Sequence, residues 1–151
     1  MAGETDGWAR GAGLAAITGC RTALGPALVC RSTARSASLR AGATLASVLE
    51  LIGDKLPWTP DRTAPLGLAL RIVSGAGVAR ALLRRRGRAA AAGALALGAA
   101  AAVLAAFVGL RLRRALTRRL GGGARASALA GVLEDAALVA LGARLVRPRP
   151  S

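Results

Sequence analysis

The stretch that decides the fold is AAAAGALALGAAAAVLAAFVGL, which runs from Ala89 to Leu110. Its 22 residues carry no charge, and a transmembrane helix needs about 20 predominantly apolar residues. A core helix of this length in a soluble protein would be expected to present a polar face. The stretch therefore predicts a helix that crosses a lipid bilayer.

The composition of the whole chain favours the same environment. Hydrophobic residues make up 54% of the 151 residues, and the mean hydropathy of +0.47 is too apolar for an ordinary soluble domain of this size. Four further segments are apolar but carry at least one charge, namely residues 11–30, 38–56, 66–83 and 126–146. We therefore predict an all-α, polytopic helical membrane protein with about five hydrophobic helices, forming a single membrane domain over residues 1–151.

Two pieces of the sequence recur in the same order. Leu14-Ala-Ala-Ile-Thr-Gly-Cys-Arg21 is similar to Leu104-Ala-Ala-Phe-Val-Gly-Leu-Arg111, and Leu45-Ala-Ser-Val-Leu-Glu50 is similar to Leu129-Ala-Gly-Val-Leu-Glu134. Each half thus offers one arginine and, a helix later, one glutamate. This pattern predicts a two-unit internal repeat, with unit one at about 11–83 and unit two at about 89–146.

The repeat bears on how the chain crosses the membrane. If all five segments span, the basic stretches 31–40 and 111–125 lie on opposite sides, as an inverted repeat requires. The positive-inside rule does not choose an orientation, because both ends of the 89–110 segment are strongly basic. The N-terminus carries acids where a signal peptide would carry a basic region, so we expect the first helix to be retained.

The net charge of +15, from 22 basic and 7 acidic residues, requires an anionic counterpart. Nucleic acid is disfavoured because aromatic residues, which stack on bases, make up only 2% of the chain. The arginine runs also flank hydrophobic segments, so anionic lipid headgroups are the expected partner. We expect six arginines to contact headgroups or to determine topology: Arg84, Arg85, Arg86, Arg88, Arg114 and Arg118.

Local sequence predicts two interruptions of the helices. Pro26 leaves the carbonyl four residues earlier without its partner, so a kink is expected near Thr22 in the 11–30 helix. Residues 111–118 continue the 89–110 helix with arginines on one face and leucines on the other. We expect this piece to lie along the membrane interface until Gly121-Gly122-Gly123 ends it.

A few charges fall inside apolar sequence, where each costs about 2.5–3.5 kcal/mol at bilayer depth and therefore needs a partner. Arg21 lies near the middle of the first predicted helix and Glu134 near the middle of the last. The simplest pairing joins Arg21 or Arg111 to Glu50 or Glu134, with further charges beside the glutamates. The predicted intramembrane charged centre is Arg21, Glu50, Asp54, Lys55, Arg111, Glu134 and Asp135.

Two functions are compatible with such a centre. Transporters place substrate and ion sites at a polar centre between repeats, so the protein could move a small ion or solute. Alternatively, the opposite charges neutralise each other and hold the helices in register, in a structural or lipid-contacting protein. A transport pathway in so small a chain would call for a homo-oligomer. No histidine and no nucleotide-binding glycine motif is present, so we expect no enzyme activity, no cofactor and no metal site.

The segment Leu49-Glu-Leu-Ile-Gly-Asp-Lys-Leu-Pro-Trp-Thr-Pro-Asp-Arg-Thr63 closely resembles an uncharacterised family of small bacterial integral membrane proteins, known only as a domain of unknown function. The resemblance extends over nearly the whole chain, and the Glu-x-x-x-Asp-Lys-x-Pro element at 50–57 is its most specific part. It implies a multi-pass protein of the bacterial inner membrane and implies no particular activity. The chain departs from the family at Leu110, where an aromatic residue is expected before the Leu-Arg pair.

Overall fold

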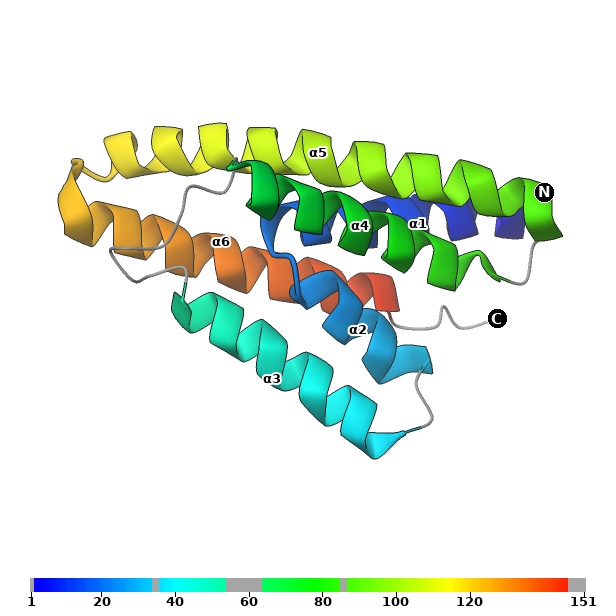
Figure 1. Ribbon diagram of the computed structural model, residues 1–151. Helices are drawn as coiled ribbons and strands as arrows, with labels where there is room; N and C mark the ends of the chain where they lie inside the picture. The colour runs from blue at the N-terminus through cyan, green and yellow to red at the C-terminus, as the bar shows by residue number, and fades with distance from the viewer. Residues whose placement is uncertain (1, 34–35, 54–63, 85–86, 147–151) are drawn as a thin grey trace.

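The computed structural model describes residues 2–33, 36–53, 64–84 and 87–146, and these residues form helices and no strands. The predicted all-α class is therefore confirmed. The helices run alternately in opposite directions along the long axis of the bundle (Figure 1). Their bounds are α1 Ala2–Cys20, α2 Leu24–Thr33, α3 Ala37–Gly53, α4 Pro65–Leu82, α5 Gly87–Arg119 and α6 Gly123–Val146.

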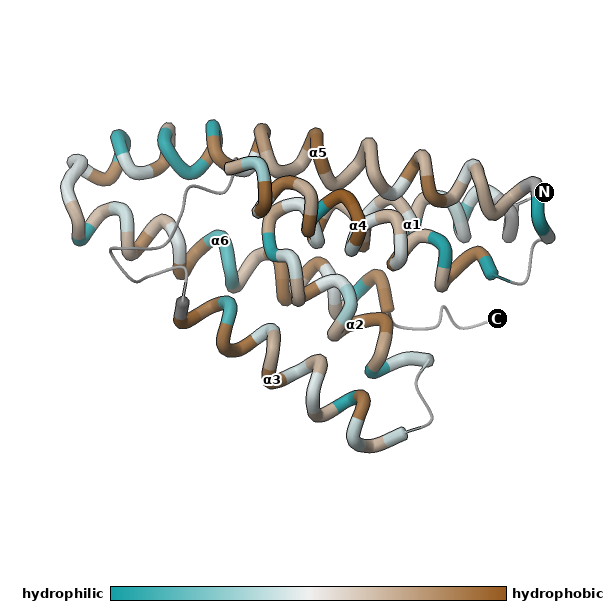
Figure 2. Tube along the Cα trace, viewed as in Figure 1, coloured by the Kyte–Doolittle hydropathy of each residue, from teal (hydrophilic) through white to brown (hydrophobic). Residues whose placement is uncertain are grey.

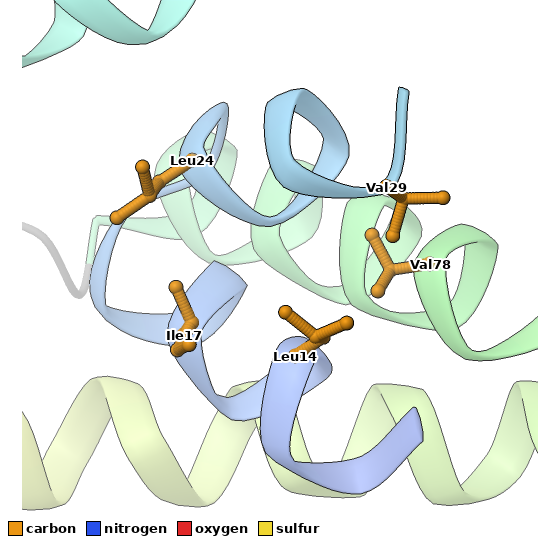
Figure 3. Packing of buried hydrophobic residues seen from close by; sticks show 5 residues of the cluster. All are labelled: Leu14, Ile17, Leu24, Val29 and Val78. Atoms are coloured by element: carbon orange, nitrogen blue, oxygen red, sulfur yellow. The ribbon is translucent and has the colours of Figure 1, made fainter. Parts of the chain in front are cut away.

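The segment predicted as one kinked helix is two helices, because the chain reverses direction at residues 21–23. Pro26 cannot donate the backbone hydrogen bond that a continuous helix would need, but the first turn of a new helix does not require it. The new helix α2 folds back against α1, where Leu24 and Val29 pack with Leu14 and Ile17 (Figure 3). The predicted kink is therefore a full reversal of the chain, and Pro26 lies in the first turn of a second helix.

Gly25 permits this close return of α2 onto α1. A Cβ atom at this position would overlap the Thr18 hydroxyl and approach the Leu14 carbonyl oxygen to 2.9 Å. The same hydroxyl donates a hydrogen bond of 2.9 Å to that carbonyl, so it has little freedom to move away. The Gly-Pro pair thus starts α2 and also lets it pack.

Helices α1, α4 and α5 pack most extensively with one another, through small residues spaced four apart. On α4, a Cβ atom at Gly75 would lie 2.6 Å from Ala102 Cβ and 2.8 Å from Gly98 O, both on α5. On α1, a Cβ atom at Gly19 would overlap the backbone of Ala102. Such close backbone approach through glycine and alanine is typical of helices that associate in lipid.

Large apolar side chains lie mainly on the outside of the bundle. Leu66, Val73 and Leu104 are 74%, 70% and 67% exposed, whereas most of the buried apolar residues are alanines. The largest fully buried side chain is that of Arg21. Figure 2 shows apolar residues along α3 and α5, with hydrophilic residues gathered at the C-terminal part of α5.

Two of the described helices are long and apolar enough to cross a membrane: α4 at Pro65–Leu82 and α5 at Ala90–Arg119. Their most apolar windows have mean hydropathies of 1.3 and 2.2. Only 22% of each window is buried, whereas the core helix of a soluble protein that passes the same test is mostly buried. By length and composition the structure supports membrane association weakly, and the expected five spans are not confirmed.

Helix α5 continues in line through its arginines, so the piece predicted to lie along the interface is an extension of the long helix. At 33 residues and 1.5 Å per residue, α5 is about 50 Å long, more than the roughly 30 Å of a hydrocarbon core. The α5–α6 hairpin accordingly extends beyond the other helices (Figure 1). Gly121, Gly122 and Gly123 end α5 as predicted, with φ angles of 92°, 73° and 80° that favour glycine.

The arrangement of the helices does not follow the two-unit repeat. The similar segments at 14–21 and 104–111 lie on α1 and α5, which run in the same direction, since Trp8 lies at Gly93 and Gly19 at Ala102. The segments at 45–50 and 129–134 lie on α3 and α6, which run in opposite directions (Figure 1). No single rotation relates both pairs, and the duplication stays a prediction about the sequence.

Candidate functional site

Three of the charged residues predicted to form a centre, Arg21, Glu50 and Asp135, lie at the reversal between α1 and α2. Arg21 follows the last residue of α1, and its backbone N–H still donates to Ile17 O at 2.8 Å. Its side chain is 1% exposed and points to α6, where Nε donates a 2.7 Å hydrogen bond to Asp135 Oδ1. Arg21 Nη2 forms an ion pair with the same oxygen, so both nitrogens engage one carboxylate.

Glu50 supports the other side of the reversal from α3. Its Oε1 accepts a 2.6 Å hydrogen bond from the backbone N–H of Thr22, and its Oε2 accepts one of 2.7 Å from the N–H of Ala23. A carboxylate at this place also suits the partial positive charge at the N-terminus of α2. Glu50 thus supplies the acceptors for two backbone N–H groups of the chain reversal.

Glu134 lies on the neighbouring side of α6, facing α5. Its Oε2 is 3.8 Å from Nη1 of Arg113, and the two side chains are 13% and 17% exposed. The guanidinium of Arg113 crosses over Gly131, where an added Cβ atom would lie 3.0 Å from Nη2. The arginine of α5 that lies beside Glu134 is therefore Arg113. Arg111, which was expected to pair with a glutamate, is exposed on α5.

The centre lies near one end of the apolar span, although the sequence placed Arg21 at the middle of a helix. Cys20 Sγ donates to Ala105 O at 3.5 Å and would be 3.0 Å from a Cβ atom at Gly109. These contacts put the end of α1 level with residues 105–109 of α5, within six residues of Arg111. That separation is at most about 9 Å along the helix axis, so the centre lies close to the basic end of α5.

Arg71 is a buried charge that the sequence analysis did not place in the centre. It is only 7% exposed, and Nη1 donates to Gly67 O at 3.1 Å on its own helix. One feature of the sequence could have indicated this burial. Arg71 lies four residues before Gly75, on the face of α4 that packs against α5. Because Arg71 shares this face with the small residues that contact α5, its side chain is buried.

The remaining predicted residues are divided between exposed ones and ones outside the described part of the chain. Arg84, Arg88, Arg114 and Arg118 are exposed at or near helix ends, where headgroup contact is sterically open. Four predicted residues lie outside the described residues: Asp54, Lys55, Arg85 and Arg86.

A cavity of about 250 Å³ lies beside the charged centre, between α5 and α6. Its walls are mainly apolar, with Leu112, Leu116 and Leu138 among them, and its polar groups come from Cys20, Arg113 and Glu134. Over the ranges that the structure describes, no three His, Cys, Asp or Glu side chains are grouped to hold a metal ion. The site is thus a set of opposite charges around a chain reversal, with a small apolar cavity at its edge.

Comparison of the chain with protein-family models, with curated proteins and with solved structures gives no significant match. The resemblance to the family of small bacterial membrane proteins therefore stays a hypothesis.

Proposed function

We propose that the chain is a multi-pass helical membrane protein with a structural, lipid-contacting role, in which the charged centre holds the reversal between α1 and α2. The observation that carries this proposal is that the large apolar side chains, which a soluble protein would bury, lie mainly on the surface. Most of the buried apolar residues are alanines, and a paired arginine is buried with them. Water would make that outer surface unfavourable, whereas lipid would cover it without cost. The bacterial inner membrane is the location that the family resemblance implies.

The charged centre supports a structural role because its carboxylates are engaged by the protein. Asp135 receives Arg21, Glu50 receives two backbone N–H groups and Glu134 lies beside Arg113. An ion or solute site would need carboxylate oxygens directed at the ligand. Here the oxygens are directed at the chain reversal and at neighbouring helices.

Membrane topology tests this proposal. With Cys20 and Cys30 replaced by alanine, single cysteines at Ser36 and Gly122 report the two ends of the bundle, because the alternating helices put these positions at opposite ends (Figure 1). We expect a membrane-impermeant thiol reagent to label only one of the two in intact cells, and both after permeabilisation. Labelling of both in intact cells would contradict a bundle that spans the membrane along its long axis.

Transport of a small ion or solute is the second candidate, and the discontinuity between α1 and α2 favours it. Transporters commonly bind ligands where a helix is interrupted, and the 250 Å³ cavity beside Glu134 lies next to this interruption.

The substitutions Glu50→Gln and Glu134→Gln distinguish the two functions. Under the structural proposal, liposomes containing the unchanged protein carry no more ion flux than empty liposomes. Glu50→Gln then lowers the free energy of unfolding by about 1–3 kcal/mol, because an amide offers one acceptor oxygen where two N–H groups require acceptors. Flux in the unchanged protein that Glu134→Gln abolishes, with the melting temperature unaltered, would establish transport instead.

A further inference from the structure

A second charged feature lies at the opposite end of the bundle from the centre. The C-terminal residues of three helices, Thr33 of α2, Leu82 of α4 and Val146 of α6, line one cavity of about 710 Å³. Because three helices end at this level, it corresponds to one surface of the proposed membrane. A cavity here would be open to both the headgroup layer and the acyl chains.

The charged groups of this cavity are arginines. Arg10 and Arg31 line it, together with the hydroxyl side chains of Ser32 and Thr33. On the other side of α2, Arg31 also lines a shallow groove of about 610 Å³ that includes Arg40 and Thr44 of α3. Among the residues that the structure describes, no acidic side chain lines either hollow, so Arg31 lies between two hollows of positive potential.

The two arginines of the cavity differ in what they already bind. Arg10 Nε donates to Leu145 O at 2.8 Å and its Nη2 donates to Val146 O at 3.4 Å, so it neutralises the C-terminal carbonyls of α6. Arg31 is exposed, and none of the described acidic side chains pairs with it. Its guanidinium is therefore available to an external anion.

The walls below the arginines are apolar. Leu28, Leu82 and Val139 line the cavity, and Leu45 and Val48 line the groove. A ligand that matches both parts has an anionic head and a hydrocarbon tail. Basic pockets between membrane helices bind anionic phospholipids through this combination.

We propose that an anionic phospholipid binds at this end of the bundle, with its phosphate against Arg31 and an acyl chain in the cavity between α2 and α6. The inference rests on the proposed membrane location and deepens the lipid-contacting role. Arg31 is the residue that selects a negatively charged headgroup. The apolar cavity is the part that selects a lipid over a soluble anion.

Native mass spectrometry of the detergent-purified full chain tests this assignment, with phosphatidylglycerol, phosphatidylcholine and inorganic phosphate as probes. We expect retained phosphatidylglycerol and little phosphatidylcholine. Arg31→Gln should weaken phosphatidylglycerol retention about fivefold, the change expected from losing one arginine near an anionic headgroup. Arg144→Gln is the matched control, because Arg144 is exposed in the last turn of α6, at the same end, and lines neither hollow.

A second pair of variants tests the acyl-chain part. Ala143 lines the cavity and Ala140, one turn earlier on α6, does not, and both are exposed. We expect Ala143→Phe to fill the cavity and reduce phosphatidylglycerol retention, and Ala140→Phe to leave it unchanged. Identical elution profiles in size-exclusion chromatography would show that the variants remain folded.

Several outcomes would overturn the inference. Equal loss in Arg31→Gln and Arg144→Gln would indicate unspecific surface charge, and equal retention of the two lipids would remove the role of charge. Displacement of the lipid by inorganic phosphate would indicate a simple anion site. If alkaline carbonate extracts the chain from membranes, the membrane proposal fails as well. If the chain resists extraction but retains no lipid, only this inference fails.

Discussion

Replacing Asp135 by leucine is expected to lower the free energy of unfolding by about 3–5 kcal/mol. The substitution removes the carboxylate that receives Arg21 Nε at 2.7 Å, while the arginine stays 1% exposed in the interior. A buried charge that loses its counter-charge retains the full cost of its desolvation. Denaturant titration of the protein in one fixed detergent, followed by circular dichroism, would measure the loss.

The double variant Arg21→Met with Asp135→Leu is the informative comparison. Two apolar side chains in place of the pair should restore most of the stability, because neither leaves a charge behind. Ala136→Leu is the control for a leucine at this level of α6, since Ala136 is exposed, and we expect it to change stability by less than about 0.5 kcal/mol. A double variant as unstable as Asp135→Leu would show that the ion pair is not the source of the effect.

Adding a single methyl group at Gly75 is the second large effect. In Gly75→Ala the new Cβ atom would meet Ala102 Cβ at 2.6 Å and Gly98 O at 2.8 Å, so α4 and α5 must move apart along their closest contact. Overpacking of this kind costs about 1–3 kcal/mol, and the involvement of backbone leaves little room for relaxation.

Gly77→Ala is the matched control, two residues further along the same helix. A Cβ atom at Gly77 meets nothing within 4 Å, so the substitution adds only helix propensity, worth up to about 1 kcal/mol. Gly75→Ala should therefore lower the free energy of unfolding and Gly77→Ala should raise it, so that the two variants differ by about 2–4 kcal/mol. Thermal unfolding in the same detergent would measure the difference. Equal melting temperatures would contradict the close approach of α4 to α5.

The charged centre was predictable in outline because charges are rare in apolar sequence and each one is conspicuous. Arg21 and Glu50 were named on that ground, and the structure brings both to the same chain reversal. Their partners were not predictable. Glu50 binds backbone N–H groups and not a guanidinium, because Pro26 turns the expected kink into a reversal whose N–H groups need acceptors.

The choice between adjacent residues shows the same limit. Successive residues on a helix point about 100° apart, so Glu134 faces Arg113 on α5 while Asp135 faces Arg21. For the same reason Arg111 and Arg113, two residues apart, lie on nearly opposite sides of α5, and only Arg113 meets α6. No pattern in the sequence states how each helix is rotated about its axis.

By itself, the sequence determined the all-α class, the long helix through Ala89 to Leu110, its end at the three glycines and the presence of charges that need partners. These features depend on residues that are near one another in the chain. Only the tertiary structure decided that residues 11–33 form two helices folded together, that Arg71 is buried and that Arg21 pairs with Asp135. Each of these depends on the rotation and close approach of helices distant in sequence, which the packing of glycines and alanines sets.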